Sequence, residues 1–91
     1  MMQARRVRIE GRVQGVGFRW ATMSEARRLG LAGWVRNLPA GGVEAFLQGE
    51  QAAVSAMIEW LGAGPMGASV RDVTVEPASP ESLAPDFEIR A

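Results

Sequence analysis

The sequence predicts an α+β two-layer sandwich in which two helices cover one face of a four-stranded antiparallel sheet. Three observations lead to this fold class. Apolar and polar residues alternate in several short segments, apolar residues recur at helical spacing in two others, and stretches rich in glycine or proline separate these segments. The predicted order is strand, helix, strand, strand, helix, strand, with a short fifth strand as an option, which fits a split strand–helix–strand arrangement.

The first strand and the first helix enclose a glycine-rich stretch. Residues 5–13 alternate and predict a half-buried strand, with Val7, Ile9 and Val13 facing the core and charged residues facing water. Residues 18–29 predict a helix whose apolar stripe is Phe18, Thr22, Ala26 and Leu29. Gly30 stands where a glycine commonly ends a helix.

The middle of the chain predicts a hairpin followed by the second helix. Residues 32–38 and 43–48 predict two strands joined by a turn over residues 39–42, and Gly49 is expected to end the hairpin. Residues 51–61 return to helical spacing, with a stripe of Val54, Met57, Ile58 and Leu61.

The last part of the chain predicts β-structure and a long loop. Val70, Val73 and Val75 lie in a β-branched segment that predicts the fourth strand. Residues 77–86 contain three prolines and two serines and predict a loop. Residues 87–90 alternate and provide the optional fifth strand.

Composition limits the possible functions. A chain of 91 residues is expected to form a single domain over residues 1–91, and its 47% hydrophobic content excludes a disordered chain. The absence of cysteine and histidine excludes thiolate nucleophiles, imidazole bases and the usual zinc ligands. The net charge of zero argues against a general affinity for nucleic acid. No apolar run long enough for a membrane span or a signal peptide is present, so we expect a cytoplasmic protein.

The stretch between the first strand and the first helix predicts an anion site. Glycines at such a junction let backbone N–H groups turn toward a ligand, and the start of a helix adds unpaired N–H groups and a partial positive charge. Arg19 in the first helical turn faces the positive end of the helix dipole, and a bound anion would relieve that conflict. An ordinary glycine turn followed by a surface arginine fits these residues equally well.

The predicted topology brings a second polar residue to the same place. Strands one and two run parallel with another strand between them, so their C-terminal ends lie at one edge of the sheet. Arg19 follows the first of these ends and Asn37 lies near the second. Asn37 shares a strand face with Val35 and is therefore expected to point toward the helices, at the rim of the sheet.

Other nucleotide-binding patterns do not fit. A phosphate-binding loop of the nucleotide triphosphatase type needs a lysine after its glycines, and a dinucleotide fingerprint needs a glycine where this chain has Trp20. An RNA-binding sheet face usually displays aromatic residues for base stacking, and Phe46 is the one candidate on strands one and three. A solvated, charged face is the preferred interpretation.

Two longer motifs resemble the acylphosphatase family. They are G-R-V-Q-G-V-G-F-R at residues 11–19 and G-L-A-G-W-V-R-N at residues 30–37. The stretches G-G-V-E at 41–44, G-P-M-G-A-S-V at 64–70 and F-E-I-R at 87–90 are similar as well. The chain departs from the family pattern in the turn, where Ala40 replaces a common aspartate and Gly42 replaces a polar or basic residue.

The resemblance implies a ferredoxin-like βαββαβ sandwich and metal-independent hydrolysis of the carboxyl–phosphate bond of acyl phosphates. It implies that Arg19 binds the phosphate and that Asn37 positions the attacking water. It also implies that backbone N–H groups of a glycine loop, residues 14–18, bind the phosphate. The members of this loop are Gln14, Gly15, Val16, Gly17 and Phe18.

The expected partners are therefore small molecules. They are an acyl phosphate as substrate and inorganic phosphate as product, with no cofactor, metal, nucleic acid or membrane, and we expect a monomer. A phosphate- or anion-binding module that uses the same loop without turnover remains the alternative, and an RNA-binding sheet face is a more distant one.

Overall fold

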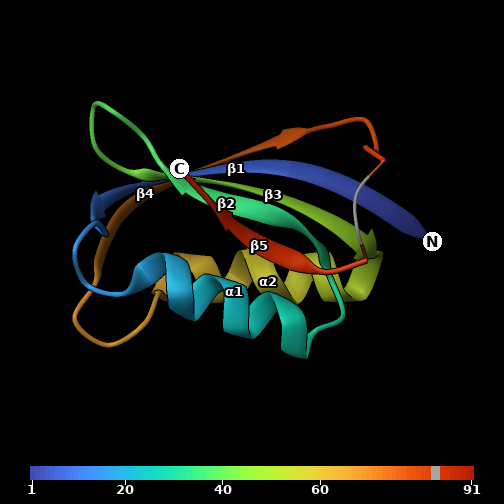
Figure 1. Cartoon of the computed structure of the whole chain (residues 1–91), viewed down its shortest axis with the longest axis horizontal. Helices are drawn as coiled ribbons and strands as arrows, with labels where there is room; N and C mark the ends of the chain where they lie inside the picture. The colour runs from blue at the N-terminus through green and yellow to red at the C-terminus, as the bar shows by residue number, and fades with distance from the viewer. Residues whose placement is uncertain (83–84) are drawn as a thin grey trace.

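The computed structural model describes residues 1–82 and 85–91, and this part of the chain forms two layers, a sheet above two helices (Figure 1). The strand order in the sheet is β4-β1-β3-β2-β5. Neither helix of the described part has the length and apolar character that a membrane crossing requires. The elements are β1 (Met2–Arg12), α1 (Phe18–Arg28), β2 (Ala32–Asn37), β3 (Val43–Glu50), α2 (Gln51–Ala63), β4 (Ser69–Pro77) and β5 (Phe87–Arg90).

The sheet has the predicted split topology. β3 lies between β1 and β2 and pairs antiparallel with both, so β1 and β2 run in the same direction. β4 pairs antiparallel with the other edge of β1. The optional fifth strand is present and pairs parallel with β2, which makes the sheet mixed. The prediction is thus confirmed for the four antiparallel strands, and β5 extends them.

The predicted end of the third strand is wrong. β3 continues through Gly49, which pairs with Gln3 of β1, instead of ending there. Gly49 is buried, and a Cβ at this position would lie 2.6 Å from the Cδ2 atom of Leu31. The glycine therefore makes room for a core side chain and does not break the strand. Of the predicted loop 77–86, residues 83 and 84 lie outside the described residues.

The main core fills the space between the sheet and the helices. The predicted helix stripes face it, with Phe18, Thr22 and Ala26 of α1 and Val54, Met57 and Leu61 of α2 buried. The strands contribute apolar residues on alternate positions, as expected for a sheet covered on one face. They include Val7, Ile9, Val35, Val43, Ala45 and Leu47.

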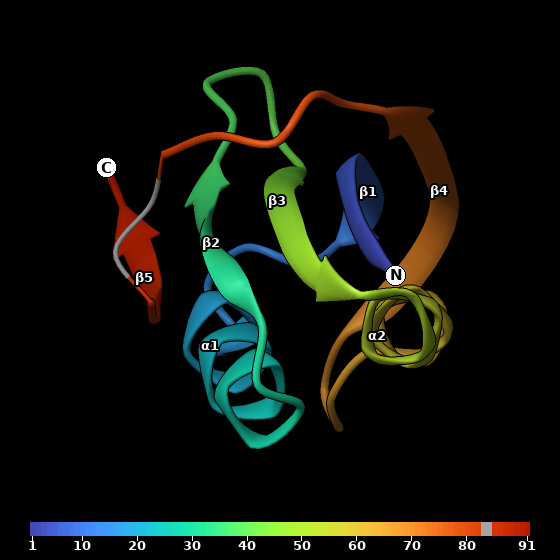
Figure 2. The ribbon, with the colours of Figure 1, turned by 90° about the vertical axis from the view of Figure 1, so that its right-hand side faces the viewer.

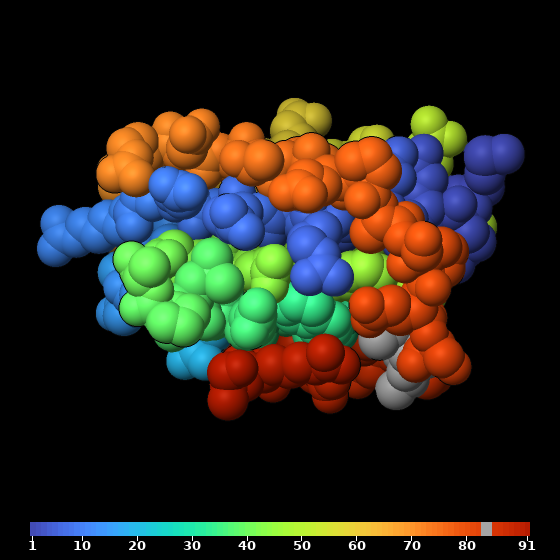
Figure 3. All heavy atoms as spheres, turned by 90° about the horizontal axis from the view of Figure 1, so that it is seen from above, coloured from blue at the N-terminus to red at the C-terminus, as the bar shows by residue number. Residues whose placement is uncertain are grey.

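The other face of the sheet, which we call the open face, carries a second apolar cluster of Ala4, Trp34 and Phe46. After β4 the chain crosses this face toward β5 (Figure 2). The Ala78 N–H donates to the Ala4 carbonyl oxygen at 3.2 Å, and the Gln48 side chain exchanges two hydrogen bonds with the main chain of Glu81. Figure 3 looks onto this face.

The expectation of a solvated, charged open face is therefore only half correct. Arg8 and Arg12 are exposed, whereas Glu44 is buried and Phe46 is fully buried. Because Ala78 of the crossing segment packs against this cluster and Arg6 lies over the Phe46 ring, that ring is not available to stack on a nucleic-acid base.

Candidate functional site

Arg19 and Asn37, which are 18 positions apart in the sequence, line the same hollow of about 300 Å³. The hollow lies where the C-terminal ends of β1 and β2 meet the start of α1, at the left of Figure 1. The predicted topology accounts for this meeting, because β1 and β2 are parallel and end at the same edge. We call this site the Arg19–Asn37 hollow, and it is lined by Val13, Gly15, Gly17, Phe18, Arg19, Trp20, Asn37 and Ile89.

The backbone of the glycine loop is turned by two left-handed residues. Gly15 has φ 77° and Gly17, the N-cap of α1, has φ 74°, a region that side chains disfavour. No side chain within residues 1–82 and 85–91 caps this end of α1. The first N–H that donates along the helix is that of Ala21, to the Gly17 carbonyl oxygen at 3.0 Å. The N–H groups of the first turn are thus left for a ligand.

The glycine loop is fixed at both of its ends. Val13 just before it and Phe18 at its end are both about 1% exposed and belong to the main core. The Phe18 ring packs against Trp60 of α2 with ring centroids 6.2 Å apart. A loop held between two buried anchors keeps its N–H groups in place before a ligand arrives, which lowers the cost of binding.

The Gln14 side chain ties the glycine loop to the turn between β2 and β3. Its Nε2 atom donates to the carbonyl oxygens of Leu38 at 2.9 Å and Gly42 at 2.8 Å. Leu38 directly follows Asn37, so this amide fixes the end of β2 relative to the loop. The family resemblance implies only a backbone role for Gln14. A long amide side chain beside a glycine turn was the available signal, but its acceptors lie 24 and 28 residues further along the chain.

Arg19 and Asn37 occupy the hollow with unused hydrogen-bonding capacity. Within residues 1–82 and 85–91, neither side chain makes a hydrogen bond, and Arg19 makes no ion pair with an acidic group. Asn37 ends β2, opposite Val43 of β3, and shares its strand face with the buried Val35. A guanidinium and a carboxamide without internal partners can therefore serve a bound anion and a bound water.

Besides the core residue Val13, two apolar residues of the hollow were not predicted as site residues. Trp20 follows Arg19 in the first turn of α1, and Ile89 comes from the optional strand β5. A large apolar side chain next to a candidate phosphate-binding arginine was a signal for Trp20. Nothing local indicated Ile89, because its place beside the hollow depends on the parallel pairing of β5 with β2.

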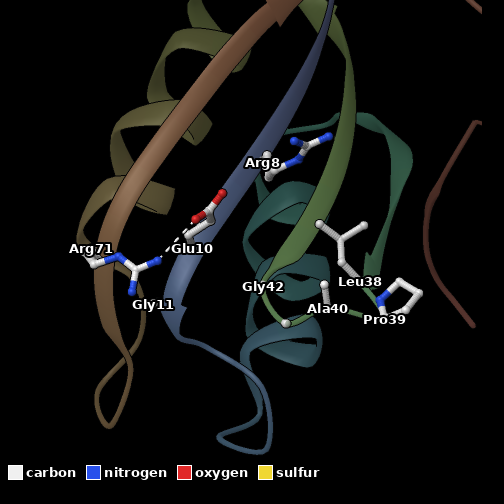
Figure 4. Close-up of a pocket in the computed structure, with 9 residues that line it drawn as sticks. Arg8, Glu10, Gly11, Leu38, Pro39, Ala40, Gly42 and Arg71 are labelled. Atoms are coloured by element: carbon white, nitrogen blue, oxygen red, sulfur yellow. Dashed lines mark hydrogen bonds and ion pairs between the residues drawn. The ribbon is translucent and has the colours of Figure 1, made fainter.

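A larger hollow of about 640 Å³ lies on the open face, between β1, β4 and the turn that follows β2. Figure 4 shows Arg71 of β4 reaching Glu10 of β1, and the two groups form an ion pair at 3.2 Å. The other side of this hollow is formed by turn residues such as Leu38, Pro39 and Ala40. Arg71 is paired with Glu10, and among the described residues none from a helix lines this hollow, so it lacks the N–H donors that the start of α1 offers an anion in the Arg19–Asn37 hollow.

The side chains of the Arg19–Asn37 hollow suit the binding of an anion beside a water molecule. Arginine binds phosphate oxygens with a planar fork of N–H donors, and N–H groups at the start of a helix add further donors. The asparagine carbonyl oxygen can accept a hydrogen bond from water. Among the described residues, no group of three or more histidine, cysteine, aspartate or glutamate side chains stands ready to hold a metal ion.

Known proteins are similar to this chain over nearly its whole length. The family model described as Acylphosphatase matches residues 5–89. An acylphosphatase from Rhizobium etli is 56% identical over 87 residues, which cover 96% of this chain and 93% of that protein. An acylphosphatase structure from Coxiella burnetii superposes with a TM-score of 0.93 at 38% identity, covering 98% of this chain and 93% of that one.

A second solved structure gives the same result over the full length of both chains. The acylphosphatase from Bacillus subtilis superposes with a TM-score of 0.90 at 37% identity and covers 100% of this chain and 100% of that one. The similarity in sequence and the similarity in fold both extend over nearly the whole chain. The chain therefore belongs to the acylphosphatase family.

Proposed function

We propose that this member of the acylphosphatase family hydrolyses the carboxyl–phosphate bond of small acyl phosphates without a metal ion. Water attacks phosphorus, the bond between phosphorus and the bridging oxygen breaks, and that oxygen leaves on the carboxylate. The products are a carboxylate and inorganic phosphate. The observation that carries the proposal is the presence of Arg19 and Asn37 in one hollow beside the glycine loop.

In this proposal, Arg19 and the backbone N–H groups of the glycine loop bind the phosphoryl oxygens. Support comes from the two left-handed glycines at the start of α1 and from a guanidinium that has no acidic partner among the described residues. Phosphoryl transfer depends mainly on positioning and on stabilising charge on the phosphoryl oxygens. Fixed donors stabilise that charge without reorganising during the reaction.

Asn37 positions the attacking water in the proposed reaction. Its carbonyl oxygen accepts a hydrogen bond from the water, which leaves an oxygen lone pair free to attack phosphorus. The water's proton passes to a phosphate oxygen of the substrate. The clamp between Gln14 and the turn that follows Asn37 supports this assignment, because it fixes the distance between the glycine loop and the end of β2.

The leaving group explains why so few residues suffice. The carboxylic acid formed from an acyl phosphate has a pKa of about 4, so the carboxylate departs without being protonated. An alkyl phosphate would release an alkoxide and would need a general acid. The chain has no histidine or cysteine to serve as that acid, and no evident alternative in the hollow.

The proposal is tested by the turnover of benzoyl phosphate with and without EDTA. We expect hydrolysis at the same rate in both conditions and very slow hydrolysis of a simple alkyl phosphate. Strong inhibition by EDTA, or efficient turnover of the alkyl phosphate, would contradict it. Binding of inorganic phosphate without any turnover would favour the alternative, a phosphate-binding module.

A further inference from the structure

Two exposed apolar residues of the Arg19–Asn37 hollow have no part in holding phosphate or water. Trp20 lines the hollow with 65% of its surface exposed, and Ile89 lines it with 38% exposed. Small-ligand sites are typically lined by apolar and aromatic side chains around a few polar groups that fix orientation. The pairing of these two residues with Arg19 and Asn37 gives the hollow both kinds of lining.

The fold does not need the Trp20 ring for its own packing. The other two tryptophans are used internally, since Trp34 is buried on the open face and Trp60 packs against Phe18 in the main core. Among the described residues, Trp20 belongs to neither apolar cluster. The exposed indole of Trp20 leaves apolar surface in contact with water, which is unfavourable. A bound apolar group would cover that surface.

Ile89 is brought to the hollow by the pairing of β5 with β2. It stands opposite Val35 in the parallel register, and Val35 shares its strand face with Asn37. Ile89 therefore lies on the face of the sheet from which Asn37 reaches the hollow. Trp20 is the immediate neighbour of Arg19 on α1. Each proposed polar group of the hollow thus has an apolar residue close to it.

We propose that Trp20 and Ile89 form an acyl subsite, which contacts the acyl group of the bound substrate and favours apolar acyl groups, aromatic ones most of all. The inference rests on the proposed function, because the acyl group is attached to the phosphate that Arg19 holds. The hollow of about 300 Å³ is at the small end of ligand pockets, which suits a small acyl phosphate.

The subsite acts on substrate binding and leaves the chemical step unchanged. The acyl group keeps its apolar part throughout the transfer of the phosphoryl group to water, so the contacts are equal in the ground state and the transition state. Contacts of this kind lower KM and leave kcat unaltered. The signature of the subsite is therefore a KM that depends on the acyl group.

The experiment compares benzoyl phosphate with acetyl phosphate in the wild type, Trp20→Ala, Trp20→Phe and Ile89→Ala. We expect Trp20→Ala to raise KM for benzoyl phosphate about tenfold, because an aromatic contact and its buried area are lost. Its KM for acetyl phosphate and both kcat values should stay within about twofold. Trp20→Phe should restore most of the preference, and Ile89→Ala should raise KM for benzoyl phosphate about threefold.

A matched control removes an apolar side chain of similar exposure from another place. Val75 of β4 is 41% exposed and does not line the hollow. Val75→Ala should leave the KM values for both substrates unchanged. A thermal unfolding curve for each variant separates a loss of folding from a loss of substrate contact.

The outcomes distinguish the subsite from the function on which it rests. If Trp20→Ala and Ile89→Ala keep the wild-type ratio of the two KM values while hydrolysing both substrates, the subsite is overturned and the proposed function stands. Equal losses on both substrates would overturn the subsite as well, because the residues would then support the site in general. If the wild type hydrolyses neither substrate, the proposed function fails and the subsite fails with it.

Discussion

The arginine side chains of two regions of this molecule, the open face of the sheet and the Arg19–Asn37 hollow, have different surroundings. On the open face, Arg6, Arg36 and Arg90 lie 5.8, 5.7 and 5.1 Å from the centre of the Trp34 ring. Arg36 also binds the buried Glu44 at 2.8 Å. In the hollow, Arg19 has no acidic partner among residues 1–82 and 85–91.

The difference separates two uses of the same side chain. A guanidinium that already binds a carboxylate and covers an aromatic ring stabilises the fold, and an anion would have to compete with those contacts. A guanidinium without an internal partner, beside unpaired backbone N–H groups, is available to a ligand. Substitutions in the two regions should therefore have opposite effects on stability and activity.

Arg19→Ala should have the largest effect on activity. We expect kcat/KM to fall by about 10³ or more, because the main charged ligand of the phosphoryl group is lost. Arg19→Lys should recover little, since an ammonium cannot reproduce the planar fork. Arg6→Ala on the open face is the matched control and should keep kcat. Equal losses in the Arg6 and Arg19 variants would remove the distinction between the two regions.

Asn37→Ala should have the next largest effect. We expect kcat to fall by a factor on the order of 10², as for the loss of one positioned polar group in an active site. The fold should persist, because Asn37 lies at the rim of the sheet and is only half-buried. Steady-state kinetics with benzoyl phosphate measure this effect. A wild-type kcat would mean that the water is held by another group.

Glu44→Ala tests whether the paired arginines of the open face stabilise the fold. The Glu44 carboxylate is buried and lies 2.8 Å from Arg36 and 3.5 Å from Arg6. Its removal should lower the free energy of unfolding by roughly 2 kcal/mol, since hydrogen bonds to charged groups are lost and two guanidinium groups lose their partner. Urea unfolding measures the change. The kcat of the folded variant should match the wild type, and a selective loss of kcat would show that the two regions are coupled.

Gln14→Ala should have the smallest effect of the four. Two hydrogen bonds of a partly exposed amide are lost, so we expect the free energy of unfolding to fall by roughly 1 kcal/mol, or a Tm lower by about 4–8 °C. Because the end of β2 is then less firmly held, kcat should fall by less than about tenfold. Unchanged stability together with unchanged kcat would mean that the clamp has no role in positioning Asn37.

Much of the fold was predictable because each element carries its own periodicity. Alternation located the strands, and the helical stripe from Phe18 to Ala26 indicated which face of α1 is buried. The role of Gly49 was not predictable, because the side chain that requires a glycine there, Leu31, belongs to another segment. The burial of Phe46 likewise depends on the distant segment that contains Ala78.

The candidate site was likewise predictable only in part. Arg19 and Asn37 were predicted to meet because strand order and direction alone bring the C-terminal ends of β1 and β2 together. The Gln14 clamp and the place of Ile89 depend on long-range contacts whose partners carry no local signal. Local patterns thus predicted the polar residues of the hollow, and tertiary contacts were needed to find the residues that surround them.

Arg19 is proposed to bind the phosphate while Asn37 positions the water, and the affinity for inorganic phosphate distinguishes these two roles. Calorimetric titration of the wild type, Arg19→Ala and Asn37→Ala at constant ionic strength gives the three dissociation constants. We expect Asn37→Ala to bind phosphate within about twofold of the wild type and Arg19→Ala to lose binding, because of these two side chains Arg19 alone is proposed to contact the phosphate. Equal loss of binding in both variants would contradict this division of roles.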